Sequence, residues 1–157
     1  TLERAGDLLD EMKVPFVINQ NRYNILDRGI EENGLKAVSE KRGKGIISFC
    51  SLAQGVLTDR YLEGIPEDSR IMTDGRFLKS DQVLSQMETV RRLNEVAVAR
   101  GENLAQMALK WIMRDGVVTS MLVGASRPSQ ILENLKVLEG APLSEEEIAE
   151  IDRICGR

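Results

Sequence analysis

The chain has 157 residues, of which 42% are hydrophobic and 29% are charged, a balance that fits one globular domain. Its formal net charge of −4 argues against a nucleic-acid partner, and since it has no run of 18 apolar residues we expect no membrane span. The two cysteines, Cys50 and Cys155, form neither a metal-ligand spacing nor a disulfide framework, so we expect no metal site and a cytoplasmic location.

Two features of the sequence suggest a piece of a larger protein. The chain begins at Thr1 and enters a helical pattern at once. It also contains no histidine, the residue most often used for acid–base catalysis and for metal binding.

The first predicted helix covers residues 2–12, where apolar residues recur at helical spacing. Pro15 ends it, and residues 16–20 (FVINQ) predict a short buried strand. The residues expected to share the apolar face of the helix are Leu2, Ala5, Leu9 and Met12.

A second helix and strand follow. Residues 31–43 predict a helix with Leu35 and Val38 directed inward, and residues 45–50 (GIISFC) predict a second buried strand. The segment 51–80 has weak periodicity. A connection that long inside a compact domain is usually a functional lid or disordered.

Two more helices come next. Residues 81–101 predict the first, and Asn103 with Gln106 forms a capping box that predicts the start of the second. The expected inner face of this second helix consists of Leu104, Ala108, Trp111 and Ile112.

The last part of the chain predicts a strand and two helices. Residues 119–123 (TSMLV) predict a third buried strand, Pro128 suits the first turn of a helix, and Ser144 with Glu147 forms a second capping box. The residues expected to face inward on the helix after Pro128 are Ile131, Leu132, Leu135 and Leu138.

The alternation of strands and helices indicates an α/β fold with parallel strands and right-handed crossovers. The strands are almost continuously apolar, which is typical of strands covered on both faces. Three parallel strands alone would leave two open edges and too few helices to cover both faces. We therefore interpret residues 1–157 as a single partial domain, part of a barrel.

The joint between the third strand and the following helix has the chemistry of a phosphate site. Backbone N–H groups at a helix start lack partners and the helix dipole is positive there. Gly124 permits close approach, Ser126 offers a hydroxyl and Arg127 a planar cation. An ordinary helix cap with solvated polar residues explains these residues as well. Three further polar residues lie one turn on: Gln130, Glu133 and Asn134.

Three segments resemble aldo-keto reductases, in order and at fitting distances. Residues 124–134 (GASRPSQILEN) resemble the phosphate- and adenosine-binding segment of that family. Residues 47–62 (ISFCSLAQGVLTDRYL) resemble its seventh strand and following loop, and residues 16–26 (FVINQNRYNIL) its sixth strand. The similarity covers essentially the whole chain and is nearest to the branch of small-aldehyde reductases and potassium-channel β subunits.

The resemblance implies the C-terminal half of a (β/α)8 TIM barrel, about strands 6 to 8 with outer helices, that binds NADP(H) at the C-terminal face. It implies that Gln20 holds the nicotinamide carboxamide and that Phe49 stacks on the ring, although Gln20 could be a strand-end amide and Phe49 a core residue. Arg127 would meet the 2′-phosphate, and Arg76 would lie in a flap, residues 56–80, over the cofactor. Leu52, Gln54 and Gly55 match the pyrophosphate turn, and Gly124, Ser126, Gln130, Glu133 and Asn134 match the adenosine end.

Other residues depart from the family pattern or have no catalytic counterpart in it. Cys50 and Ser51 replace a serine and a proline, so the turn gains freedom and a nicotinamide-side contact of residue 50 could weaken. We expect Cys50 to be a small buried residue rather than a reactive thiol. Tyr23 does not match the catalytic tyrosine, and we expect it to be structural.

The catalytic Asp, Tyr, Lys and His of the family lie on earlier strands, before the region that matches Thr1, so this chain offers no catalytic residue of its own. We expect the parent protein to be an NADP-dependent reductase of a small carbonyl substrate, an aldehyde or ketone, and the chain alone to be inactive. Its open strand edges predict association with the missing N-terminal half or with a second copy. Two alternatives remain: an NADP(H)-sensing regulatory subunit of the channel-β type, and a ligand-free structural half-barrel.

Overall fold

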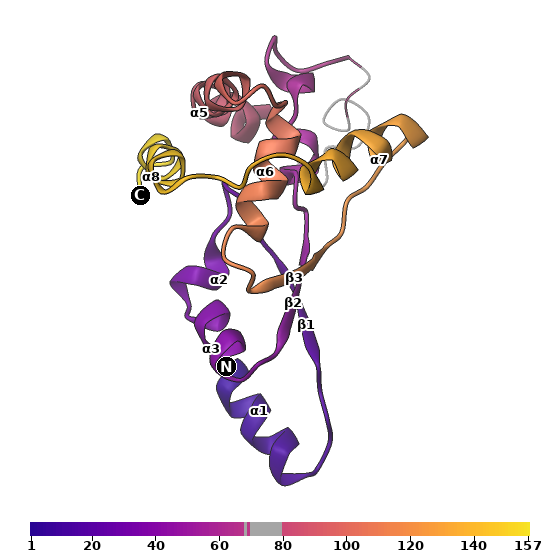
Figure 1. The fold of residues 1–157 in the computed structure, drawn as a ribbon, viewed down its shortest axis with the longest axis vertical. Helices are drawn as coiled ribbons and strands as arrows, with labels where there is room; N and C mark the ends of the chain where they lie inside the picture. The colour runs from indigo at the N-terminus through magenta and orange to yellow at the C-terminus, as the bar shows by residue number, and fades with distance from the viewer. Residues whose placement is uncertain (68, 70–79) are drawn as a thin grey trace.

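The computed structural model describes residues 1–67, 69 and 80–157 (Figure 1). Arg76 therefore lies outside the described residues. The elements in chain order are α1 Leu2–Glu11, β1 Ile18–Arg22, α2 Gly29–Glu32, α3 Leu35–Lys41, β2 Gly45–Phe49, the 3-10 turns η1 Ala53–Gly55 and η2 Asp59–Tyr61, α5 Ser80–Ala99, α6 Leu104–Met113, β3 Val118–Met121, α7 Pro128–Leu135, the 3-10 turn η3 Lys136–Leu138 and α8 Glu145–Ile154.

The strands form a parallel sheet in the order β1-β2-β3, which confirms the predicted α/β class. Gln20 pairs with Ile47, and Ile47 pairs in turn with Ser120. The register shifts between Ile46 and Ile47, where a bulge interrupts the ladder. Because the strands are parallel, their carboxyl ends meet at one edge of the sheet.

Helices cover one face of this sheet. Figure 1 shows α2 and α3 along one side of the strands, with α6 farther along. In β2, Ile46 and Ser48 are buried toward these helices, while their neighbours Ile47 and Phe49 are half-buried. None of the described helices lies over the other face, as expected for strands that are part of a barrel. An apolar run looks the same whether its second face meets helices or the inside of a barrel.

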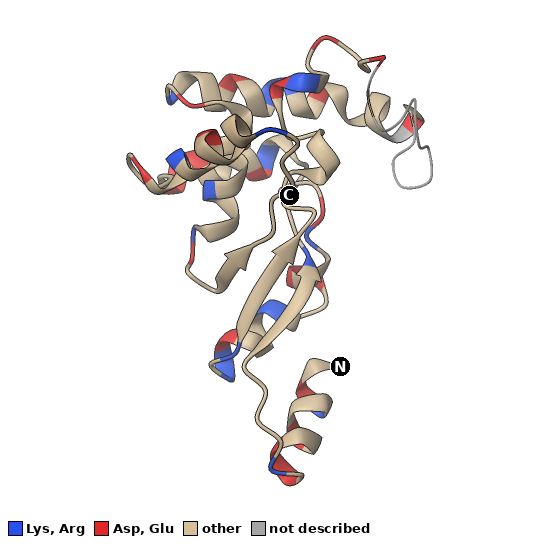
Figure 2. Cartoon of the chain, turned by 90° about the vertical axis from the view of Figure 1, so that its right-hand side faces the viewer, with Lys and Arg blue, Asp and Glu red and all other residues tan. Residues whose placement is uncertain are grey.

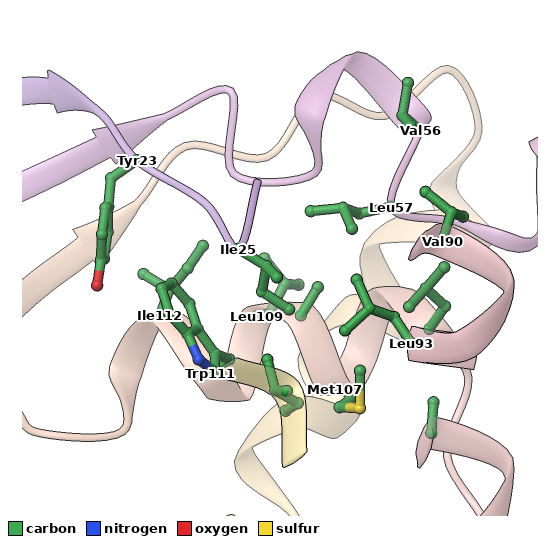
Figure 3. Close-up of a cluster of buried hydrophobic side chains, with 14 of the residues drawn as sticks. Tyr23, Ile25, Val56, Leu57, Val90, Leu93, Met107, Leu109, Trp111 and Ile112 are labelled. Carbon is green, nitrogen blue, oxygen red and sulfur yellow. The ribbon is translucent and has the colours of Figure 1, made fainter. Parts of the chain in front are cut away.

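The main core surrounds α6 (Figure 3). The four predicted inner residues of this helix are fully buried, which confirms that prediction. Leu93 of α5 and Ile151 of α8 belong to the same core, and Leu57 joins it from the loop after β2. The capping boxes of α6 and α8 are both formed. No helix in the described ranges is both long and apolar enough to cross a bilayer.

Tyr23 lies beside this core in a cluster of charged side chains. Its ring packs against Trp111 at 5.3 Å between centroids, and the Arg114 guanidinium lies 3.7 Å from the Trp111 ring centroid. The Tyr23 hydroxyl donates to Glu31 and accepts from Arg114 at 2.9 Å and Lys36 at 3.2 Å. These contacts confirm that Tyr23 is structural.

The helix predicted over residues 31–43 is two helices. The chain breaks between α2 and α3 because Gly34 takes a left-handed conformation with φ of 75°. On α3 the residues that are buried are Lys36 and Ser39, because both are hydrogen-bonded to neighbouring elements. Leu35 and Val38, which we expected to face inward, are half-buried.

The apolar face predicted for α1 is only partly covered, since Leu2 and Leu9 are half-buried while Ala5 is exposed. Met12 is 69% exposed, and the one buried residue of the helix is Gly6. Arg42 explains this, since its guanidinium lies against Gly6, where a β-carbon would come within 2.7 Å, and pairs with Asp7 and Asp10. An ionic contact, rather than an apolar stripe, therefore attaches this helix.

The inward face predicted for α7 is wrong. The three predicted residues in the helix, Ile131, Leu132 and Leu135, and the fourth, Leu138 in η3, are between 50% and 73% exposed. Val137 of η3 is buried instead. The backbone of α7 contacts α6 instead: the Glu133 carbonyl accepts a 3.1 Å hydrogen bond from the Gln106 side chain of α6. No apolar layer of the described residues covers that face.

Candidate functional site

The uncovered face of the sheet carries Gln20 and Phe49 side by side. Gln20 pairs with Ile47 and Arg22 pairs with Phe49, so the alternation of β-strands places all four side chains on one face. Gln20 is exposed and Phe49 is half-buried. Phe49 is therefore accessible from the uncovered face of the sheet.

The chain after β2 makes a turn with unusual backbone geometry. Cys50, Ala53 and Gln54 all have positive φ, at 53°, 48° and 58°, and Gly55 follows at 98°. Such values are uncommon for residues other than glycine, and they concentrate at binding and catalytic sites. Cys50 is half-buried, so the expectation of a buried cysteine is not met. This turn is where the sequence predicts the pyrophosphate cradle.

Two buried side chains hold this turn in place. Asn24 donates from Nδ2 to the Cys50 carbonyl at 2.9 Å and caps its own loop through Oδ1. Ser51 is buried, and its hydroxyl lies 3.1 Å from that of Ser48 and donates to the Leu122 carbonyl at 3.2 Å. These bonds restrain the turn at the position where the family has proline. The extra freedom that we expected from the replacement is thus offset by a side-chain tether.

A cleft of about 200 Å³ opens beside this turn. It is lined from the end of β1, from the turn after β2 and from the first turns of α5. Two of its residues, Cys50 and Gln54, were predicted as site residues, whereas Arg22 and Asp27 were not. The signal for Arg22 was present in the sequence, because residue 22 shares a strand face with residue 20. We missed it because β1 ends two residues later than predicted.

The joint before α7 brings several donors to one point. The Gln130 side-chain oxygen accepts from the Ser126 amide at 2.8 Å, the Ser126 hydroxyl at 3.1 Å and the Arg127 amide at 3.2 Å. Pro128 is the first residue of the helix, as predicted. Gly124, Ser126 and Arg127 are exposed. A single oxygen with three donors occupies the place where a phosphate oxygen could bind.

The two other polar residues predicted here have different surroundings. The Glu133 carboxylate pairs with Lys136 at 2.8 Å, and Asn134 is half-buried. Figure 1 shows that the chain continues from β3 through an extended connection before α7 begins. The structure thus places Gln20 and Phe49 on one face of the sheet, with the turn after β2 directly beyond Phe49, and carries residues 124–134 on the segment that follows β3.

Charge is distributed unevenly over these elements. Figure 2 shows acidic and basic residues mainly on the helices, while the strands are almost free of them. In the three strands Arg22 is the one charged residue. It pairs with Asp27 at 2.8 Å between Nε and Oδ2. The described residues contain no cluster of three His, Cys, Asp or Glu side chains arranged to bind a metal.

Known proteins are similar to this chain over nearly its whole length. The model of the aldo/keto reductase family matches residues 1–155. An L-glyceraldehyde 3-phosphate reductase from Escherichia coli O157:H7 is 44% identical over 155 residues, which are 96% of this chain and 45% of that protein. A Schizosaccharomyces pombe protein described as a voltage-gated potassium channel subunit beta is 34% identical over 88% of this chain and 42% of its own length.

Solved structures show the same fold. A glycerol dehydrogenase from Gluconobacter oxydans superposes with a TM-score of 0.72 at 24% identity, over 92% of this chain and 45% of that one. A thermostable aldo-keto reductase, solved with the inhibitor epalrestat, gives a TM-score of 0.67 at 26% identity, over 95% of this chain and 43% of that one. The chain spans less than half the length of these relatives.

Proposed function

The chain belongs to the aldo/keto reductase family, and we propose that it is the cofactor-binding C-terminal half of an NADP(H)-dependent reductase of small aldehydes or ketones. The single observation that carries this proposal is the uncovered face of the sheet, which presents Gln20 and Phe49 next to the turn that follows the end of β2. In parallel barrels, ligands bind where the strands end.

The nicotinamide end of the cofactor fits the uncovered face of the sheet. Gln20 presents an exposed amide that can donate to and accept from a carboxamide. Phe49 offers a half-buried ring two positions beyond the residue that pairs with Gln20 on the neighbouring strand. Cys50 lacks the oxygen of the serine that the family has here, so its contact with the nicotinamide side would be weaker. We assign the carboxamide to Gln20 and the ring contact to Phe49.

The pyrophosphate fits the turn after β2. Successive positive φ values in a turn direct backbone N–H groups into a concave surface that suits anions. The turn supplies this geometry at Ala53, Gln54 and Gly55, directly after Leu52. We propose that its backbone binds the phosphates and that the Ser51 tether keeps it in shape.

The adenosine end fits the joint before α7. We propose that Ser126 and Arg127 bind the 2′-phosphate, which would replace the Gln130 oxygen as the acceptor of their hydrogen bonds. Gly124 lies in open space, with no atom within 4 Å of the position that a β-carbon would take. Glu133 and Asn134 then face the adenosine from the next turn.

The chemistry of the parent enzyme is hydride transfer, which bound NADPH supplies to the carbonyl carbon. The residues of this chain would orient the nicotinamide and leave its face open. The carbonyl oxygen also needs a proton donor. Both tyrosines of the chain, Tyr23 and Tyr61, are buried, and burial followed by the hydrogen bond to Glu31 raises the pKa of the Tyr23 phenol. The chain also has no histidine. We infer that the donor comes from outside this chain and that the chain alone is inactive.

A regulatory role is the second candidate, and the similarity to a channel β subunit favours it. The same residues would then bind NADP(H) as a sensor. The two free thiols, Cys50 and Cys155, fit the reducing cytoplasm under both hypotheses.

A titration of the longest natural protein that carries this chain tests the proposal. NADPH emission should change saturably on addition of protein, and a small aldehyde should then oxidise the bound NADPH. Trp111 is a poor reporter, since it is buried beside Tyr23 and away from the uncovered face. Binding without oxidation would favour the sensor, and no saturable binding would refute both cofactor roles.

A further inference from the structure

Arg22 is a charged residue at the rim of the proposed nicotinamide site. It ends β1, lies two residues beyond Gln20 on the same face, and is in register with Phe49. Two residues along a strand span about 6–7 Å. The guanidinium therefore belongs to the immediate surroundings of the proposed nicotinamide contacts.

The local structure orients this guanidinium. Its Nε pairs with the Asp27 carboxylate at 2.8 Å, and the Asp27 amide donates to Asn24 Oδ1 at 2.9 Å. Asn24 is in turn bonded to the Cys50 carbonyl. Asp27 thus contacts the guanidinium on its Nε side. The Arg22 side chain is still 59% exposed and lines the cleft of about 200 Å³.

An arginine held through Nε can still bind an anion through Nη1 and Nη2. The planar arrangement of these two donors matches two oxygens of a phosphate. A fixed side chain also loses less conformational freedom when it binds than a free one. Asp27 consequently orients Arg22 without using the part of it that binds a phosphate best.

We infer that Arg22 determines substrate specificity by binding the phosphate of a short phosphorylated aldehyde. This inference rests on the proposed function, since it requires the nicotinamide to lie against Gln20 and Phe49. An extended three-carbon chain together with its phosphate ester is close in length to the two-residue distance along β1, so its aldehyde would reach the nicotinamide while its phosphate meets Arg22. The Escherichia coli relative is described as a reductase of a substrate of this class.

The cofactor carries phosphates as well, so the test must separate the two sources. Glycerol 3-phosphate added to the NADPH-loaded protein is a useful probe, because an alcohol product cannot react with reduced cofactor. Calorimetry of its binding, with glycerol as the uncharged counterpart, reports on the substrate phosphate alone. A separate NADPH titration reports on the cofactor.

The experiment compares the full protein with Arg22→Gln, Arg22→Lys and the control Arg4→Gln, which removes an exposed arginine on α1. We expect Arg22→Gln to weaken glycerol 3-phosphate binding at least tenfold and to lower the ratio of kcat/KM for glyceraldehyde 3-phosphate over that for glyceraldehyde by a similar factor. Arg22→Lys should recover part of both losses, and Arg4→Gln should change neither.

Two results would overturn the inference while leaving the proposed function intact. One is an unchanged ratio of the two kcat/KM values in Arg22→Gln. The other is a loss confined to NADPH affinity, which would assign Arg22 to the cofactor. If the wild-type protein binds no NADPH, the proposed function fails and this inference fails with it.

Discussion

The hydroxyl of Ser51 donates a hydrogen bond to the backbone carbonyl of Leu122 at 3.2 Å. This contact joins the turn after β2 to the chain that leaves β3, across 71 residues of sequence. It lies where the family pattern has proline, which could make no such bond. The turn of this chain is therefore restrained by a side-chain hydrogen bond.

Replacing Ser51 with alanine should destabilise the protein. The change removes the donor to the Leu122 carbonyl and leaves the buried Ser48 hydroxyl without this partner. We expect the free energy of unfolding to fall by about 1–2 kcal/mol, as for the loss of a buried hydrogen bond. Urea denaturation measures it, with the exposed Ser129→Ala as the control. Equal stability of the two variants would show that the tether contributes nothing.

Glu31 should make stability depend on pH. Burial raises the pKa of its carboxyl, but hydrogen bonds from Tyr23 and Arg114 and the charges of Arg114 and Lys36 outweigh this, so the pKa lies below its ordinary value of 4.5. A carboxyl whose pKa is lowered in the folded state stabilises that state at neutral pH. This contribution disappears as the pH falls from about the ordinary value through the folded pKa.

The variant Glu31→Gln tests this dependence. At pH 7 we expect it to lower the free energy of unfolding by about 2–3 kcal/mol, because hydrogen bonds to a charged group are lost. As the pH falls below about 4.5, the gap between wild type and variant should close. Denaturation curves from pH 7 to pH 3 measure the gap, and Glu88→Gln, at an exposed position of α5, is the control. A gap that stays constant over this range would contradict the prediction.

The exposed apolar face of α7 should make the 157-residue chain associate when it is produced alone. Leu132 and Leu135 are 65% and 52% exposed, and apolar faces of this kind promote contacts between molecules. Replacing both with lysine should lower the weight-average mass in sedimentation at micromolar concentration toward that of the monomer. The control is Glu139→Lys, at an exposed site beyond the helix. If the wild-type chain sediments as a monomer, the prediction fails.

The sequence predicted best where local chemistry decides the structure. The capping boxes at Asn103 and Ser144 and the start of α7 at Pro128 depend on neighbours within one turn, and all three are formed. The parallel sheet also followed from the alternation of elements. The inner face of α6 was correct because that helix is surrounded on several sides by α5, α8 and the sheet.

The errors share a different cause. Burial of the apolar residues on α7 depends on what else packs there, which periodicity cannot show. Lys36 is buried because of partners distant in sequence, such as Asp115, that are visible only in three dimensions. Arg22 was missed because a boundary error of two residues removed it from the strand. The roles proposed for Gln20, Phe49 and Arg127 remain predictions that binding experiments must test.

The substitution Arg127→Ala addresses the 2′-phosphate. If the exposed guanidinium binds that group, NADPH affinity should fall by about 1.5–3 kcal/mol, the range for a charged hydrogen bond, while NADH affinity changes little. Fluorescence titration of the full protein with each cofactor measures the two losses. Arg153→Ala, which removes an exposed arginine on α8, serves as the control. Equal losses for both cofactors would show that Arg127 does not recognise the phosphate.

The substitution Gly124→Val distinguishes an effect on folding from an effect on ligand binding. A β-carbon at this position meets no atom within 4 Å, so Gly124→Val should leave the free energy of unfolding unchanged within about 0.5 kcal/mol. If the cofactor lies against this backbone, the added methyl groups occupy its place, and NADPH affinity should fall at least tenfold, or by about 1.4 kcal/mol. The control Ala141→Val adds two methyl groups at an exposed site after η3. If Gly124→Val binds NADPH as tightly as the wild-type protein does, the adenosine does not bind at this joint and Gly124 has no role in binding.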